Sequence, residues 1–192
     1  MFAVFAVAAL TSYVNPFVGT AATGHTTPAA TCPFGMVQPG PDTGNLAWKY
    51  CSGYQFEDRT LIGFSQTHLS GTGAADLGDV RILPYAGGDE MPEKVDLDKA
   101  TERAEPGFYA VTAGGVGVEI AASPRVAFYR LTFPEKGRAH VKLDPALGLI
   151  RNEREWPGIP RNIVGQPQPN VLAGDYRRFG WGVREVHWRL QA

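Results

Sequence analysis

Residues 108–121 read FYAVTAGGVGVEIA, and this stretch decides the fold class. In its second half, one set of apolar side chains alternates with small or polar ones: Val116, Val118 and Ile120 against Gly117, Glu119 and Ala121. Residues 108–112 alternate in the same way. A period of two is typical of a β-strand with one buried face, because successive side chains point to opposite faces. The intervening Ala113-Gly114-Gly115 supplies a turn, so the stretch predicts a β-hairpin.

The strand pattern continues after this hairpin. Ser123-Pro124 interrupts it, and residues 126–133 then form a run rich in β-branched and aromatic side chains. A turn over residues 134–138 leads to another alternating run at residues 140–144. Four strands at intervals of about ten residues favour an antiparallel β-sandwich. We therefore expect an all-β fold.

The flanking regions are less regular. Residues 11–88 are dense in Gly, Pro, Thr and Ser, which predicts loops and short strands. Residues 97–103 could be helical but show no sustained apolar face, so we expect an exposed loop or a single turn there. Residues 175–192 alternate like a hairpin and stop in mid-pattern. A sheet that stops there has an unpaired edge, so we expect a sandwich that is incomplete at the C-terminus.

Composition excludes several classes of protein. The 192 residues include 23 Gly and 15 Pro, about a fifth of the chain against a usual share of roughly 12%, which argues against a helix bundle. Hydrophobic residues make up 44% and charged residues 19%, so the chain is not disordered. The net charge of −1 and the lack of long Lys/Arg runs argue against nucleic acid or an anionic membrane surface as partner.

Two features of the N-terminal third leave alternatives open. The apolar run over residues 1–10 is half the length of a membrane span, and is either the remnant of a signal peptide or a ragged start. Cys32 and Cys51 are separated by 18 residues, which is neither a redox pair nor a zinc spacing. Whether these two cysteines form a disulfide stays open.

One group of residues has the chemistry of a carbohydrate site. His25, Trp48, His68 and Asp76 stand among glycine-rich segments such as Ser70-Gly71-Thr72-Gly73. Small residues let the backbone approach a ligand, while Ser, Thr, His and Asp bond hydroxyl groups and Trp offers a flat apolar face. An ordinary glycine-rich turn around a buried histidine is the alternative. The sequence shows no metal-chelating spacing and no carboxylate pair suited to acid and base catalysis.

A series of short motifs runs through the chain in a fixed order. They are YVNPFVGT (13–20), GHT (24–26), PFGMVQ (33–38), PDT (41–43), CSGY (51–54), IGFS (62–65), THLSGTG (67–73), AEPGFY (104–109), PRV (124–126) and YRRFGW (176–181). Their order and spacing resemble the N-terminal domain of the glycoside hydrolase family 92 α-mannosidases. The likeness covers residues 11–192, which we expect to form that β-sandwich domain, preceded by the possible signal remnant over 1–10.

This resemblance implies a function. Members of the family resemble a β-sandwich followed by an (α/α)6 barrel, with the active site between the two. The family implies calcium-dependent, inverting, exo-acting removal of mannose from α-linked glycans. The resemblance places the catalytic carboxylates and the calcium ligands in the helical domain, outside this chain. Trp48, His25, His68 and Asp76 are then expected to line the sugar-facing rim, with Trp48 as its apolar face.

Three hypotheses follow from these observations. The first is an α-mannosidase fragment whose partners are an α-mannose-containing glycan and the (α/α)6 domain, and which is inactive alone. The second is a stand-alone carbohydrate-binding sandwich without catalysis. The third is a structural domain that docks a helical partner. By the habit of the family, we expect a periplasmic, extracellular or surface-exposed location, and no membrane-spanning segment.

Overall fold

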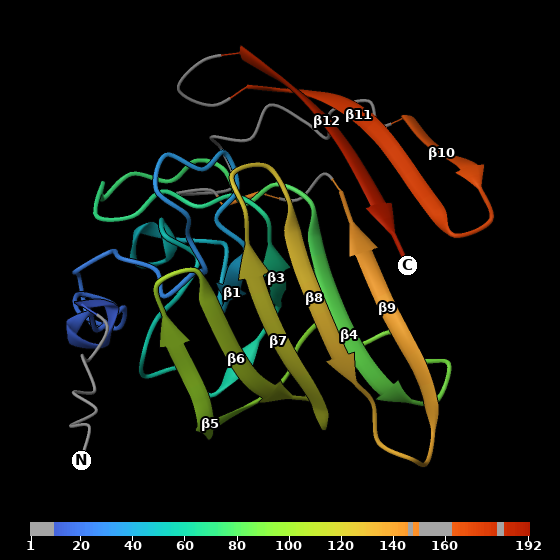
Figure 1. Ribbon diagram of the computed structural model, residues 1–192, viewed down its shortest axis with the longest axis horizontal. Helices are drawn as coiled ribbons and strands as arrows, with labels where there is room; N and C mark the ends of the chain where they lie inside the picture. Colours follow the sequence, from blue (N-terminus) through green and yellow to red (C-terminus); the bar gives the residue numbers. More distant parts are fainter. Residues whose placement is uncertain (1–9, 146–147, 150–162, 180–182) are drawn as a thin grey trace, which may run out of the picture.

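Two antiparallel sheets pack face to face, and a third sheet lies over one end of them (Figure 1). The computed structural model describes residues 10–145, 148–149, 163–179 and 183–192. In this part of the chain, the helical elements are the short 3-10 turns Leu10–Tyr13 and Trp48–Tyr50. The expected all-β antiparallel fold is confirmed. Nearly all of the possible signal remnant lies outside the described residues.

The first sheet has five strands in the order β2-β5-β6-β7-β8. Its strands are β2 (Thr60–Leu61), β5 (Val95–Glu105), β6 (Phe108–Ala113), β7 (Val116–Ala122) and β8 (Ala127–Thr132). The predicted hairpin is confirmed, with Val111 of β6 opposite Val118 of β7. Its turn uses Gly114 and Gly115 at φ 55° and 77°, a conformation that only glycine adopts freely.

The second sheet has four strands in the order β1-β3-β4-β9. They are β1 (Gly40–Asp42), β3 (Gly63–Ser65), β4 (Arg81–Gly87) and β9 (Arg138–Asp144). The two short strands come from the region that the sequence predicts to be loops and short strands, and the last one from the predicted run at 140–144. All pairings in this sheet are antiparallel.

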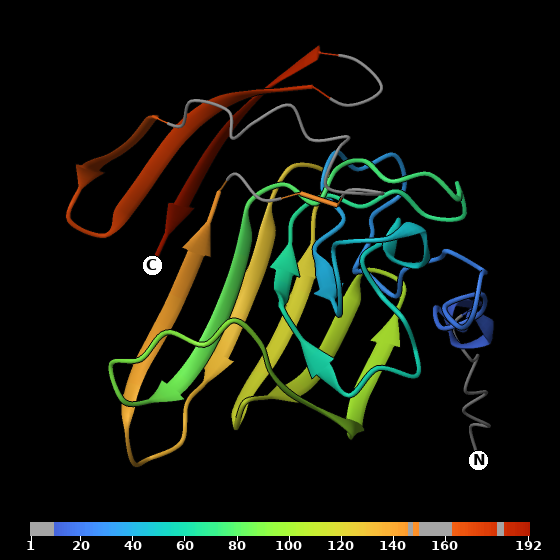
Figure 2. The same cartoon turned by 180° about the vertical axis from the view of Figure 1, so that it is seen from behind.

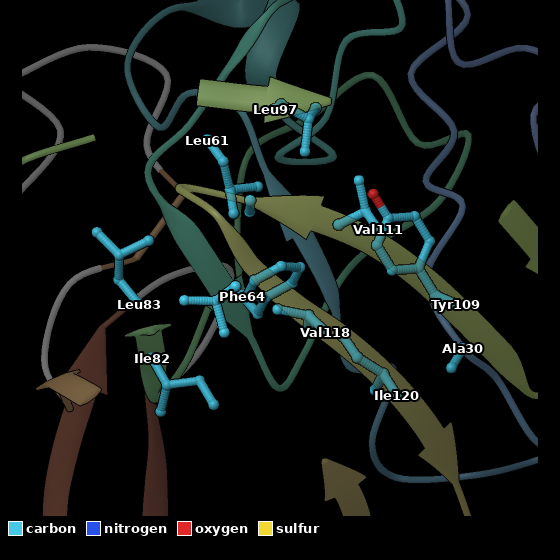
Figure 3. Packing of buried hydrophobic residues seen from close by; sticks show 12 residues of the cluster. Ala30, Leu61, Phe64, Ile82, Leu83, Leu97, Tyr109, Val111, Val118 and Ile120 are labelled. Carbon is cyan, nitrogen blue, oxygen red and sulfur yellow. The ribbon is translucent and has the colours of Figure 1, made fainter. Parts of the chain in front are cut away.

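The hydrophobic core lies between these two sheets (Figure 3). Phe64 of β3 faces the hairpin, with its ring centroid 6.3 Å from that of Tyr109 on β6. Val111, Val118 and Ile120 of the hairpin are at most 3% exposed. Because each fully buried aliphatic or aromatic side chain contributes roughly 1.5–3 kcal/mol, this contact fixes the packing of one sheet on the other.

The third sheet comes from the C-terminal part of the chain. It contains β10 (Ile163–Gln168), β11 (Val171–Phe179) and β12 (Val183–Gln191), paired antiparallel in that order. The predicted hairpin-like run of residues 175–192 is confirmed where the structure describes it, in residues 175–179 of β11 and 183–191 of β12. Figure 2 shows this sheet beside the loops at one end of the sandwich, where the Tyr176 hydroxyl donates to Asp79 Oδ1 at 2.7 Å.

The expectation of a loop over residues 97–103 is wrong, because these residues belong to strand β5. The register against β6 shifts between Asp98 and Arg103, so five steps along β5 pass only two on its partner. This bulge breaks the period of two and hides the strand in the sequence. It also allows Glu102 to turn inward, where the hydroxyl groups of Tyr54 and Tyr109 donate to its carboxylate at 2.9 and 2.6 Å. Burial and this carboxylate raise the pKa of both phenols, so both remain donors.

Candidate functional site

The loops that carry the predicted site residues gather at one end of the sandwich, beside the third sheet (Figures 1 and 2). Three segments meet there around His25. Its imidazole Nδ1 lies 3.0 Å from Cys51 Sγ, and its ring centroid lies 4.3 Å from that of Trp48, edge to face. Trp48 Nε1 donates to the carbonyl of Gly73 at 2.7 Å, and the N–H of Gly71 donates to the carbonyl of His25 at 2.7 Å. We call His25, Trp48, Cys51 and residues 71–73 the histidine–tryptophan cluster.

The backbone at His25 is unusual for a residue with a side chain. Its φ is 57°, in the left-handed region. The residue before it must be glycine, because a Cβ on Gly24 would fall 2.0 Å from the carbonyl oxygen of Gly19. A conformation of this kind persists where the surrounding structure holds it in place. The Gly24-His25 pair therefore fixes the position of the imidazole.

Burial dominates the electrostatics of Cys51 in this cluster. Burial raises the pKa of the Cys51 thiol, against the opposing effect of nearby backbone N–H groups that include those of Ser52 and Gly73. Cys51 is 1% exposed and His25 is 3% exposed. The imidazole Nε2 of His25 is buried and has no hydrogen-bond partner among the residues that the structure describes.

A second group of polar side chains lies next to this cluster, and we call it the ion cluster. Asp42 at the end of β1 accepts hydrogen bonds from Arg81 Nε at 2.8 Å and from His68 Nε2 at 3.0 Å. His68 Nδ1 donates to the carbonyl of Gln38 at 2.7 Å, so both ring nitrogens face acceptors, as in an imidazolium. Burial alone would raise the pKa of Asp42, but the positive charges of Arg81 and His68 outweigh it and lower this pKa.

The segment Cys51-Ser52-Gly53-Tyr54 joins the two clusters. Cys51 contacts His25 in the first, and the backbone of Gly53 packs against the second. A Cβ on Gly53 would lie 2.2 Å from Asp42 Oδ1 and 3.2 Å from the imidazole of His68. The glycine at this position therefore lets the loop lie directly on the buried ions.

The structure places the four predicted site residues at different depths. Trp48 is 47% exposed, whereas His25, His68 and Asp76 are 3%, 4% and 7% exposed. His25 and Trp48 are in contact, while His68 belongs to the ion cluster and the Asp76 carboxylate accepts from the N–H of Leu77 at 2.7 Å. Contact of these residues with a sugar stays a prediction.

The sequence analysis missed the roles of Cys51, Asp42 and Arg81. It considers Cys51 as a member of a disulfide, a redox pair or a zinc site and as part of the CSGY motif, but not as a partner of His25, and in the structure Cys32 and Cys51 are both free thiols. The CSGY and PDT motifs contain Cys51 and Asp42, so attention to the motifs as structural units would have found them. Arg81 carries no local signal, because its partner lies 39 residues away.

The described residues offer no site for the calcium ion that the resemblance implies. In them, no group of three or more His, Cys, Asp or Glu side chains is placed to hold a metal ion. The residues that the structure describes therefore do not fit such a site. A search of the same residues finds no helix long and apolar enough to cross a membrane.

Fold and site together define an antiparallel β-sandwich domain that carries its aromatic and polar residues on long loops at one end. A family model described as the glycosyl hydrolase family 92 N-terminal domain matches residues 13–185. The chain belongs to this family, as its motifs indicate.

Solved structures agree with this assignment. The GH92 α-mannosidase BT3965 from Bacteroides thetaiotaomicron is 32% identical with a TM-score of 0.83, over 94% of this chain and 25% of that one. The GH92 inverting mannosidase BT2199 of the same organism is 28% identical with a TM-score of 0.71, over 88% of this chain and 22% of that one. A curated relative from Arthroderma benhamiae, described as an uncharacterized secreted glycosidase, is 29% identical over 133 residues, 64% of this chain and 17% of the relative. The chain thus spans about a quarter or less of the length of these relatives.

Proposed function

We propose that this chain is the N-terminal portion of an α-mannosidase that hydrolyses α-mannosidic bonds in glycans, and that its loops contribute to the sugar pocket. Family membership supports the enzyme class, and the solved relative BT3965 has been described in complex with mannoimidazole. The relative from Arthroderma benhamiae is described as secreted, which supports an extracytoplasmic location.

The observation that carries this proposal is the fixed but half-exposed ring of Trp48. The hydrogen bond to Gly73 and the edge-to-face contact with His25 hold the indole at two points, yet 47% of the residue is open to solvent. A rigid aromatic face beside polar groups matches the two kinds of surface that a pyranose presents, its apolar C–H face and its hydroxyl groups. Preorganisation of this kind lowers the entropic cost of binding.

The catalytic step belongs, in this proposal, to the rest of the complete protein. Inversion at the sugar needs a carboxylic acid and a carboxylate about 6.5–9.5 Å apart, facing the same bond. Here three buried carboxylates already serve the fold: Asp42 binds Arg81, Glu102 binds two tyrosines, and Asp79 accepts from Thr67 Oγ1 at 2.7 Å. We therefore assign the catalytic acids, the calcium ion and the (α/α)6 barrel to residues outside this chain.

The test uses a complete family 92 α-mannosidase whose N-terminal domain is replaced by this chain. We expect Trp48→Ala to lower kcat/KM about tenfold, equivalent to about 1.4 kcal/mol of lost transition-state binding. The matched control is Phe128→Ala, which removes an aromatic side chain that is 58% exposed on strand β8 and should change kcat/KM less than about twofold. Equal kinetics for wild type and Trp48→Ala would refute the assignment.

The 192-residue chain alone provides the second arm of the test. We expect no mannose release from α-mannobiose, and detectable release would refute the proposed division of labour. Calorimetric binding of mannobiose by this chain, together with no effect of Trp48→Ala on the complete enzyme, would favour the stand-alone carbohydrate-binding sandwich instead.

A further inference from the structure

We propose that Cys51 is a positioning residue: its thiol holds His25 in the tautomer that carries the proton on Nε2, and this N–H donates to a hydroxyl oxygen of the bound glycan. The inference rests on the proposed function, because the glycan is the ligand that supplies the hydroxyl.

The hydrogen bond between the side chains of Cys51 and His25 has a definite direction. The Cys51 sulfur lies 3.0 Å from His25 Nδ1. Burial raises the pKa of this thiol, so the S–H proton is present at neutral pH. Backbone N–H groups, among them those of Ser52 and Gly73, face the sulfur as donors, which leaves Nδ1 as the acceptor for the S–H. A neutral imidazole that accepts at Nδ1 carries its proton on Nε2.

The backbone of residues 25 and 26 holds the imidazole of His25 in place. His25 has φ 57°, and its carbonyl accepts from the N–H of Gly71 at 2.7 Å. The neighbouring N–H of Thr26 donates to the carbonyl of Gly19 at 3.2 Å. The hydrogen bonds of this backbone therefore hold the imidazole in contact with both Cys51 and Trp48.

The Nε2 of His25 is a buried group without a hydrogen-bond partner in the described part of the chain. The residue as a whole is 3% exposed. Buried polar groups are nearly always paired, so a donor without a partner at this position needs an acceptor from elsewhere. A hydroxyl oxygen of a sugar that packs on the adjacent Trp48 has the right chemistry. It reaches Nε2 only when the loops that cover this nitrogen move, because Nε2 is closed to solvent in this structure. The imidazole of His68 differs, because both of its nitrogens already have partners.

A direct chemical role for Cys51 fits the structure less well. A nucleophilic cysteine needs a thiolate. Burial raises the pKa of this thiol, which favours the protonated form. Its effect on a ligand is therefore exerted through His25.

The tautomer can be measured directly in the 192-residue chain labelled with ¹⁵N. Long-range ¹H–¹⁵N correlation at about pH 8, above the usual titration range of histidine, distinguishes a protonated Nε2 from a protonated Nδ1. We expect His25 to be protonated on Nε2 in the wild type and in Cys51→Ser, whose hydroxyl still donates. Cys51→Ala should give a mixture of tautomers. Cys32→Ala is the matched control, since it removes the other free cysteine, and it should leave the His25 signals unchanged.

A wild-type chain with the proton on Nδ1 would overturn the inference without any variant, so a variant that fails to fold does not weaken the test. Unchanged His25 signals in a folded Cys51→Ala would overturn it as well.

Titration with mannose then separates the inference from the proposed function. We expect mannose to shift the Nε2 signal. Its affinity should fall about twofold in Cys51→Ala, because in an even mixture of tautomers about half of the molecules carry the proton on Nε2, and it should stay unchanged in Cys51→Ser. No mannose-dependent shift in a wild type that has the expected tautomer would overturn the glycan assignment, while the positioning of His25 by Cys51 would stand.

Discussion

Replacing Asp42 by Asn tests whether the ion cluster supports the fold. The side chain of Asp42 is completely buried, and its two oxygens have separate partners: Oδ1 accepts from His68 and Oδ2 from Arg81. Asparagine keeps the shape of aspartate but has only one oxygen. Its amide NH₂ must therefore face either the imidazole N–H or the guanidinium N–H, and the positive charge of Arg81 loses its counterion.

The expected loss of stability is large. Removal of one partner from a buried ion pair costs about 3–5 kcal/mol, because the remaining charge stays buried without compensation. In a protein of this size, about 2–4 °C of Tm corresponds to 1 kcal/mol, so we expect Tm to fall by about 6–20 °C. An exposed pair gives the matched control: Glu119 and Arg130 lie 3.2 Å apart with side chains 37% and 78% exposed. Glu119→Gln should cost at most about 1 kcal/mol.

Urea unfolding followed by circular dichroism and tryptophan fluorescence measures the difference. We expect Asp42→Asn to lower the midpoint with an unchanged m-value, since the surface exposed on unfolding stays the same. A loss no larger than that of Glu119→Gln would refute the conclusion that the buried ions stabilise these loops.

The stability difference between wild type and Asp42→Asn should depend on pH. The pKa of Asp42 is lowered in the folded chain, since Arg81 and His68 outweigh the effect of burial, whereas an unfolded aspartate titrates near 3.9. The unfolded state therefore binds the proton more readily, and the stability that the carboxylate contributes is fully present well above about pH 4. It is lost as the pH falls through the folded-state pKa. The gap between wild type and Asp42→Asn should narrow below about pH 4, and a constant gap would contradict the ion pairing.

Two further substitutions test the loops and the third sheet. Gly71→Ala should lower the free energy of unfolding by about 1–2 kcal/mol for its positive φ alone, because a Cβ there meets nothing within 4 Å. Gly53→Ala should lower it by about 1–3 kcal/mol more, because its Cβ meets Asp42. Equal losses of unfolding free energy in urea would contradict the close approach of Gly53. Tyr176→Phe should cost about 1.5–3 kcal/mol and speed amide exchange in β11, since its hydroxyl donates to the buried carboxylate of Asp79. An effect no larger than that of Tyr13→Phe, at a residue 80% exposed, would argue against this link.

The strands that the sequence predicts correctly are those in which neighbouring residues alone reveal which side chains are buried. In β6 and β7, every second side chain faces the core, and glycines mark the turn, so period and turn chemistry agree. Strand β5 fails this test because its bulge shifts the register, and because Glu102 is buried by pairing with tyrosines from elsewhere in the chain. A charged residue buried in this way is indistinguishable, in sequence, from one on an exposed loop.

The candidate site shows the same limit. The chemistry expected of a carbohydrate site brings His25 and Trp48 forward as candidates, and the structure places their rings in contact. The ion cluster joins residues 26 and 39 positions apart, and no periodicity relates Asp42 to His68 or Arg81. The role of Cys51 depends on a contact between side chains 26 residues apart. Each of these contacts depends on how the loops fold over the sheet.

The two clusters together explain how irregular loops can present a fixed surface. Loops lack the ladder of hydrogen bonds that holds a strand, so a precise site on them needs rigid support from below. Here Asp42 and Arg81 stand on strands β1 and β4 of the four-stranded sheet. Gly53 lays the CSGY segment on these ions, and Cys51, two residues earlier, holds His25. The geometry of the histidine–tryptophan cluster is therefore linked to the four-stranded sheet through the buried charges of the ion cluster.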